Sequence, residues 1–148
     1  MLGTDEITIL AGGEQTGGAL FAVEIRMHPG GGPPVMHRHA PGEIYYVLDG
    51  EFTFYTDDAP AGVRRVTATA GDVVPLAGGV PHTIRNESDR DAVAFVVHAP
   101  GAPMEQFSRA VAAAAAAGPP DMAVVLEIAA RSGIELLGPI PDRADLAR

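Results

Sequence analysis

The stretch GGPPVMHRHAPGEIYYVLDG, residues 31–50, places two histidines and a glutamate ahead of an apolar run. His37 and His39 are two positions apart, so in an extended segment both imidazoles point to the same side. Glu43 follows Pro41-Gly42, where a bend is expected, and its even offset keeps the carboxylate on that side if the strand phase survives the bend. Taken one by one, these residues could also be surface-loop histidines and a solvated charge.

A further donor comes from the segment GDVVPLAGGVPHTIRN, residues 71–86, in which His82 opens a strand after Pro81. Three neutral imidazoles and one carboxylate form a charge-matched donor set for a divalent cation, with room left for water, substrate or dioxygen. The chain has no cysteine, which excludes thiolate ligands and disulfides. The expected cofactor is therefore one divalent ion held by nitrogen and oxygen: iron, manganese, nickel, cobalt, zinc or copper.

The first two-thirds of the chain consists of short segments rich in β-branched and aromatic residues, separated by glycine and proline. This spacing is typical of an all-β sandwich or barrel. Asp49-Gly50 between two apolar runs predicts a hairpin with a type I′ turn. The alternation within Leu20–His28 predicts one buried and one wetter face. The predicted strands are Glu6–Leu10, Leu20–His28, Glu43–Leu48, Glu51–Thr56, Val63–Thr69, Asp72–Leu76, Pro81–Asn86 and Ala92–His98.

After Pro100 the pattern predicts two helices. Pro103 suits the first turn of the first helix, whose apolar positions are Met104, Phe107 and Val111. Asp121 offers an N-cap to the second helix and Gly133 fits the position after its end, with Met122, Val125 and Ala129 as the apolar stripe. The tail from Pro139 to Arg148 is expected to be irregular. We expect one domain, with a β-barrel over residues 1–100 and a helical extension over residues 101–148 packed on it.

Both histidine-bearing segments resemble a known family. Gly31…His37-Arg-His39…Glu43…Gly50 resembles the first cupin motif, G-x5-H-x-H-x3-E-x6-G, and residues 71–86 resemble the second, with Ala77 where the family usually has proline. The resemblance implies an all-β, double-stranded β-helix barrel of the jelly-roll type with two C-terminal helices. It also implies a metal ion at one mouth of the barrel, with these ligands: His37, His39, Glu43 and His82. Gly31, Gly50, Gly71, Gly79 and Asn86 resemble structural positions of the two motifs.

Strand phase places five apolar side chains below the expected metal ion: Tyr45, Val47, Met27, Phe54 and Ile84. They predict either an apolar substrate pocket or an ordinary barrel core, and the core is the favoured alternative for all except Tyr45. His98 ends a strand and is a candidate for orienting a ligand imidazole from behind, or else a satisfied core or rim histidine. Ile44, Tyr46 and Leu48 face outward, which predicts a homodimer interface or a covering helix.

The net charge of −9, with arginine as the only basic residue type, disfavours nucleic acid as a partner. The start of the chain lacks the features of a signal peptide, and no stretch is long and apolar enough to span a bilayer. We therefore expect a cytoplasmic protein that binds a small molecule and no membrane.

The resemblance leaves three functions open. The first is a metal-dependent dioxygenase for a small apolar, phenolic or enol substrate, with Glu43 as ligand and, if its pKa rises toward neutrality, as catalytic base. The C-terminal segment Ile128–Pro139 favours this class, because it resembles small bacterial cupins described as quercetin-dioxygenase-like. The second is a non-redox isomerase, cyclase, lyase or decarboxylase at the same site. The third is a non-catalytic module that binds a metal or a small molecule.

Overall fold

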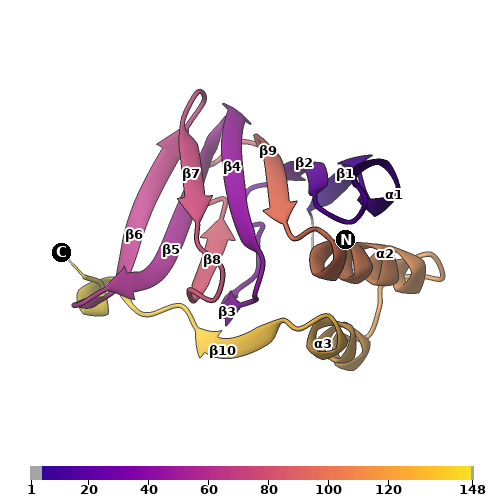
Figure 1. Ribbon diagram of the computed structural model, residues 1–148. Helices are drawn as coiled ribbons and strands as arrows, with labels where there is room; N and C mark the ends of the chain where they lie inside the picture. The colour runs from indigo at the N-terminus through magenta and orange to yellow at the C-terminus, as the bar shows by residue number, and fades with distance from the viewer. Residues whose placement is uncertain (1–4, 148) are drawn as a thin grey trace.

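The computed structural model describes residues 5–147 and contains two five-stranded antiparallel sheets (Figure 1). One sheet has the order β1 (Glu6–Ala11), β2 (Phe21–Met27), β9 (Ala92–Ala99), β4 (Gly42–Asp49) and β7 (Val73–Leu76). The other has the order β10 (Glu135–Pro139), β3 (Val35–Arg38), β8 (His82–Arg85), β5 (Glu51–Ala59) and β6 (Gly62–Thr69). A short helix α1 (Gly13–Thr16) follows β1, and α2 (Ala102–Ala115) and α3 (Met122–Arg131) lie near the C-terminus. The predicted all-β, double-stranded β-helix with two C-terminal helices is confirmed.

The inward faces of both sheets meet in one hydrophobic core. On β2, Phe21, Val23, Ile25 and Met27 are buried, as their alternation along the sequence predicts. They belong to the same buried cluster as Phe54 on β5 of the opposite sheet. Burial of a side chain of this size contributes about 1.5–3 kcal/mol, so the core holds the sheets face to face. The strand ends that carry the histidines are thereby fixed in position.

Asp49-Gly50 does not form the predicted hairpin. β4 pairs with β7 and β9, whereas β5 pairs with β6 and β8, so the chain passes from one sheet to the other at Gly50. A type I′ turn needs a positive φ at both central residues, but within the described residues only glycines have one, Gly50 among them with φ +73°. The prediction is wrong because the same local sequence suits a hairpin and a crossing between sheets.

The two C-terminal helices begin and end close to the predicted residues. Pro103 lies in the first turn of α2, and the Asp121 side chain accepts a hydrogen bond of 2.9 Å from the backbone N–H of Ala123 at the start of α3. Gly133, just beyond α3, has φ +77°, as expected for a residue that ends a helix. The predicted stripe of α3 is wrong at Met122, which is 65% exposed. The described helices include none that is long and apolar enough to cross a membrane.

The segment after α3 contains a strand, β10, for which no prediction was made from sequence. β10 runs along β3 at the edge of its sheet, where it pairs Glu135 with Arg38 and Leu136 with His37 (Figure 1). An ion pair of 2.7 Å joins Arg38 Nε to Glu135 Oε2 across the two strands. Residues 101–148 are thus more than a helical extension, because they complete one of the sheets.

The outward-facing residues of β4 are exposed. Ile44, Tyr46 and Leu48 are 42–48% accessible, and Val73, the partner of Tyr46 on β7, is 57% accessible. The covering helix considered as one alternative is therefore not found among the described residues. The homodimer stays a prediction.

If this face binds a second copy, Tyr46→Glu is expected to convert a dimer into a monomer, because a carboxylate in an apolar interface must lose its hydration. Light scattering after gel filtration measures the mass directly. Met122→Glu is the matched control, since it adds the same charge at an exposed apolar residue of α3. A wild-type protein that is monomeric throughout the concentration range would contradict the expected dimer.

His28 joins β1 to the β8–β9 connection through two carboxylates. Its Nδ1 lies 2.8 Å from Asp91 Oδ1 and its Nε2 lies 3.0 Å from Glu6 Oε1. Both ring nitrogens can donate at the same time only in the imidazolium form. The hydrogen bond to Asp91, and to a smaller extent that to Glu6, raises the pKa of His28.

This raised pKa predicts a pH-dependent contribution to stability. The stabilisation is fully present below the pKa of about 6.5 in the unfolded chain and is lost as the pH rises through the higher pKa of the folded protein. We expect His28→Gln to lower the melting temperature at pH 5.5 and to have a smaller effect at pH 9. A difference that is the same at both pH values would contradict this role.

Candidate metal centre

Three histidines lie close together on β3, just after β3 and on β8. His37 lies on β3 directly opposite His82 on β8, and His39 follows β3 two residues after His37. One ring nitrogen from each of the three lies within 4.8 Å of the others. Nitrogens bound to a common zinc-like ion at about 2.1 Å are at most about 4.2 Å apart, so a small contraction suffices for all three to bind one ion.

The backbone selects which nitrogen of each ring faces the centre. Nδ1 of His37 lies 3.4 Å from the backbone oxygen of Val35. Nδ1 of His39 lies 2.9 Å from that of Pro41, and Nδ1 of His82 lies 2.8 Å from that of Val80. A carbonyl oxygen can only accept, so each Nδ1 carries the proton and each Nε2 presents a lone pair. Ligand histidines are commonly oriented in this way.

Glu43 lies beside these lone pairs. Its Oε1 is 2.7 Å from His82 Nε2 and 3.7 Å from His39 Nε2. The contact with His82 is not aligned as a hydrogen bond, so Nε2 of this ring, 1% exposed, has no hydrogen-bond partner within the described residues. A carboxylate oxygen facing imidazole lone pairs at such distances is unfavourable unless a positive charge, such as a bound cation, lies between them. The arrangement therefore fits a divalent cation.

The pKa values of His37 and Glu43 agree with this donor set. Burial, followed by the charge of His82, lowers the pKa of His37 to about 4, which keeps this ring neutral. Burial alone would raise the pKa of Glu43, but the close contacts with the rings of His39, His82 and His98 outweigh it and hold that pKa well below its usual range. Burial opposes charge on His82, yet the Glu43 carboxylate raises the pKa of that ring. The carboxylate is therefore ionised and attracts a positive charge.

His98 lies against Glu43, and its ring also meets that of His39 edge-on, with centroids 6.5 Å apart. Its Nε2 is 2.7 Å from Glu43 Oε2, and the two residues are directly opposite each other on β9 and β4. The ring is 5% exposed and stacks on Phe21, with centroids 5.8 Å apart. The shortest polar contact of His98 is thus with the carboxylate, and its role in orienting a ligand imidazole stays a prediction.

Comparison with known families agrees with this geometry. The model of the cupin domain family matches residues 23–98, which include all four proposed donors. The chain belongs to the cupin family. No curated protein matches the chain.

Solved structures share the fold of this cupin. A predicted oxalate decarboxylase from Thermotoga maritima is 25% identical, with a TM-score of 0.56 over 64% of this chain and 79% of the other. A cupin-like protein from the same organism is 17% identical, with a TM-score of 0.60 over 93% of this chain and 79% of its own. A sugar phosphate isomerase of the cupin superfamily from Silicibacter pomeroyi is 23% identical, with a TM-score of 0.50 over 63% and 59% of the two chains.

The five side chains considered as a substrate pocket all lie in the hydrophobic core of this cupin. They are at most 6% exposed: Tyr45, Val47, Met27, Phe54 and Ile84. Along β4, Tyr45 comes nearest to the site. The pKa of its phenol is raised well above the usual value, mainly by burial and also by the negative charges of Glu43 and Asp5. Its hydroxyl is therefore protonated at neutral pH.

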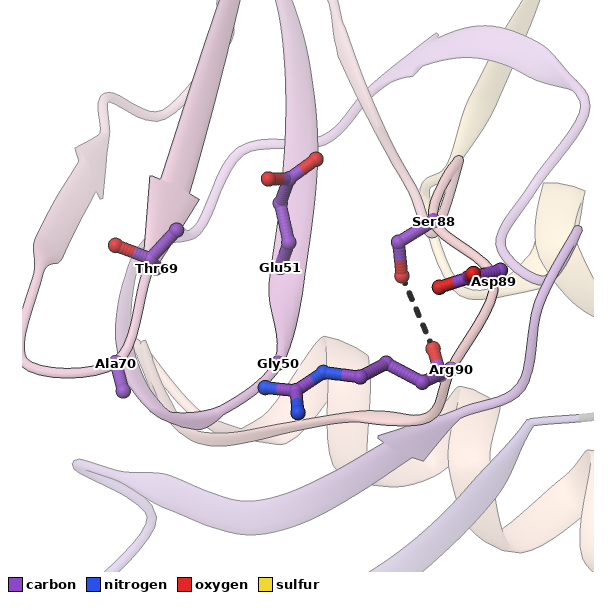
Figure 2. A pocket seen from close by; sticks show the side chains of 7 residues that line it. All are labelled: Gly50, Glu51, Thr69, Ala70, Ser88, Asp89 and Arg90. Atoms are coloured by element: carbon purple, nitrogen blue, oxygen red, sulfur yellow. Dashed lines mark hydrogen bonds between the residues drawn. The ribbon is translucent and has the colours of Figure 1, made fainter.

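A surface pocket lies where β4 passes into β5, beside the connections that follow β6 and precede β9 (Figure 2). Its polar side chains are at least partly exposed, and one hydrogen bond of 3.0 Å joins Ser88 Oγ to the backbone oxygen of Arg90. No proposed metal ligand lines it; the lining residues are Gly50, Glu51, Thr69, Ala70, Ser88, Asp89 and Arg90. We assign it no role in the chemistry of this cupin.

Two contributions to the site of this cupin were not predicted from sequence. Leu136 and Glu135 on β10 flank the strand that carries His37, and Phe21 packs on the ring of His98. The alternation along β2 indicates that Phe21 is buried, but not which ring it contacts. Nothing in the sequence around Leu136 indicates that it pairs with β3.

Proposed function

We propose that this cupin is a metal-dependent dioxygenase that acts on a small, apolar organic molecule of the phenolic or enol type. The observation that carries the proposal is the cluster of His37, His39 and His82, with the Glu43 carboxylate beside His39 and His82. We assign His37, His39, His82 and Oε1 of Glu43 as the ligands. These four donors leave coordination positions open for a substrate oxygen and for dioxygen.

The distribution of positive charge supports an uncharged or weakly acidic substrate. Eight arginines of the described residues donate hydrogen bonds to carboxylates or backbone carbonyls elsewhere in the protein: Arg26, Arg38, Arg64, Arg65, Arg85, Arg90, Arg109 and Arg131. Arg38, although adjacent to both His37 and His39 in sequence, is bound to Glu135. These guanidinium groups are therefore engaged elsewhere, which disfavours recognition of a strongly anionic substrate by arginine.

The bound ion would supply Lewis acidity toward a substrate hydroxyl and, if it is iron, manganese, nickel, cobalt or copper, access to dioxygen chemistry. With their protons on Nδ1, the three imidazoles would present Nε2 to the ion as neutral donors. Glu43 keeps its negative charge. A role of Glu43 as catalytic base would need its pKa to rise toward neutrality. Its pKa is lowered instead, and a carboxylate with a lowered pKa accepts protons poorly.

A non-redox metal-dependent reaction is the second candidate. It is favoured by the 25% identity to the structure described as a predicted oxalate decarboxylase. The same donor set would then stabilise an enolate or a related anion without oxidation. The two candidates differ in their requirement for dioxygen and for a redox-active metal.

The test is elemental analysis of the purified protein, followed by oxygen-electrode assays with phenolic and enol substrates. The dioxygenase requires oxygen uptake that matches product formation and that is absent from the zinc-substituted protein. Turnover without oxygen, or with zinc, would instead support the non-redox enzyme. Tight binding of the substrate panel without turnover under either condition would support a binding module and contradict both enzymes.

A further inference from the structure

We propose that His98 is a positioning residue that holds Glu43 by one carboxylate oxygen, so that only the other oxygen binds the metal. This inference rests on the proposed metal site and adds a residue to it. The contact between His98 Nε2 and Glu43 Oε2, at 2.7 Å, is its central observation.

The contact is built into the sheet. Glu43, His98 and Phe21 are directly opposite one another on the neighbouring strands β4, β9 and β2. Their side chains form one buried row, with the His98 ring stacked on Phe21 at an interplanar angle of 26°. The imidazole is therefore held from both sides and cannot turn away from the carboxylate without leaving the row.

The position of the ring proton distinguishes His98 from the three ligand histidines. His37, His39 and His82 each have a backbone oxygen near Nδ1, which keeps the proton there and leaves Nε2 free to bind a cation. Nδ1 of His98 is buried and has no hydrogen-bond partner within the described residues. The proton of a neutral His98 is thus best placed on Nε2, which lies 2.7 Å from Glu43 Oε2.

The two carboxylate oxygens consequently have different roles. Oε2 is occupied by His98, whereas Oε1 faces the Nε2 atoms of His82 and His39. Glu43 then occupies one coordination position and not two, which leaves space at the metal for substrate. Loss of the His98 donor would either free Oε2 to approach the metal or leave Oε2 buried without a partner. Either change would disturb the binding of Glu43 through Oε1 alone.

A matched pair of variants tests this role. In His98→Gln the amide can still donate to Oε2, whereas His98→Met has a similar length and no donor. We expect His98→Met to bind Co²⁺ about 10–100-fold more weakly than the wild type and His98→Gln to recover most of the affinity. The visible absorption of bound Co²⁺ should change in His98→Met, because its ligand-field bands report coordination number and geometry. Circular dichroism of the metal-free proteins compares their folding.

The outcomes separate the two proposals. Equal affinity and identical Co²⁺ spectra in the wild type and both variants would overturn the role of His98 and leave the metal site intact. Equal losses in the Gln and Met variants would also overturn it, since packing alone would then explain the effect. If the wild type fails to bind Co²⁺, the metal site itself is wrong, and the positioning role falls with it.

Discussion

His82→Ala is expected to reduce the metal affinity by more than about 100-fold, because loss of a direct ligand should exceed the 10–100-fold typical of losing an outer partner. His82 faces His37 across two paired strands and lies nearest to Glu43 Oε1, so its removal opens the centre of the donor set. The purified variant should contain less than a tenth of the metal of the wild type, as measured by mass spectrometry with inductively coupled plasma.

The controls distinguish loss of a ligand from loss of the fold. His28→Ala removes a histidine outside the metal centre and should keep the full metal content. His82 is almost completely buried, so His37→Ala, which changes a partly exposed ring, is the second variant. Full metal content in both His82→Ala and His37→Ala would show that the site is assigned to the wrong residues.

Gly50→Ala is expected to lower the free energy of unfolding by about 4 kcal/mol or more, a large share of the 5–15 kcal/mol typical of a domain. A Cβ at this position would lie 2.4 Å from the backbone oxygen of Asp91 and 2.8 Å from Ala92 Cα. The neighbouring atoms are backbone, so relief requires the strand connection before β9 to move. The positive φ of 73° adds a conformational cost.

Gly71→Ala provides the matched control for this effect. Gly71 also has a positive φ, of 94°, but no atom lies within 4 Å of the place where a Cβ would be. Its replacement should therefore cost only the conformational term, about 1–2 kcal/mol. Urea denaturation measures the loss of unfolding free energy in both variants. Equal losses would argue against a steric clash between a Cβ at Gly50 and the backbone of Asp91 and Ala92.

The grouping of His37, His39 and His82 could be predicted from sequence because its signals are local and periodic, whereas the role of Glu43 as a ligand stays a prediction. His37 and His39 share a face by the two-residue repeat of a strand, and the two motifs bring His82 into the same set. The partner of His98 could not be predicted, because it depends on the register of β9 against β4, two strands far apart in the chain. Sequence indicates that His98 ends a strand, but not which residue lies opposite.

The same distinction explains the errors in the fold. Asp49-Gly50 has the composition of a hairpin turn, and only the pairing of β4 and β5 with other strands shows that the chain crosses between sheets. β10 lacks a clear alternation and contains Gly138-Pro139, so it resembles the end of a helix followed by coil. Its strand conformation arises from pairing with the free edge of β3, which is a tertiary interaction.

The pairing of β10 with β3 also determines which residues a truncated protein, or another scaffold that carries this metal centre, would need. β3 has only four residues and meets β8 at a single pair, His37 with His82, while β10 accompanies its whole length from Val35 to Arg38. A fragment that ends with the family match at residue 98 would retain every proposed donor yet lack the outer neighbour of His37. Transplanting this centre onto another scaffold would accordingly require residues 135–139, or a designed substitute for them.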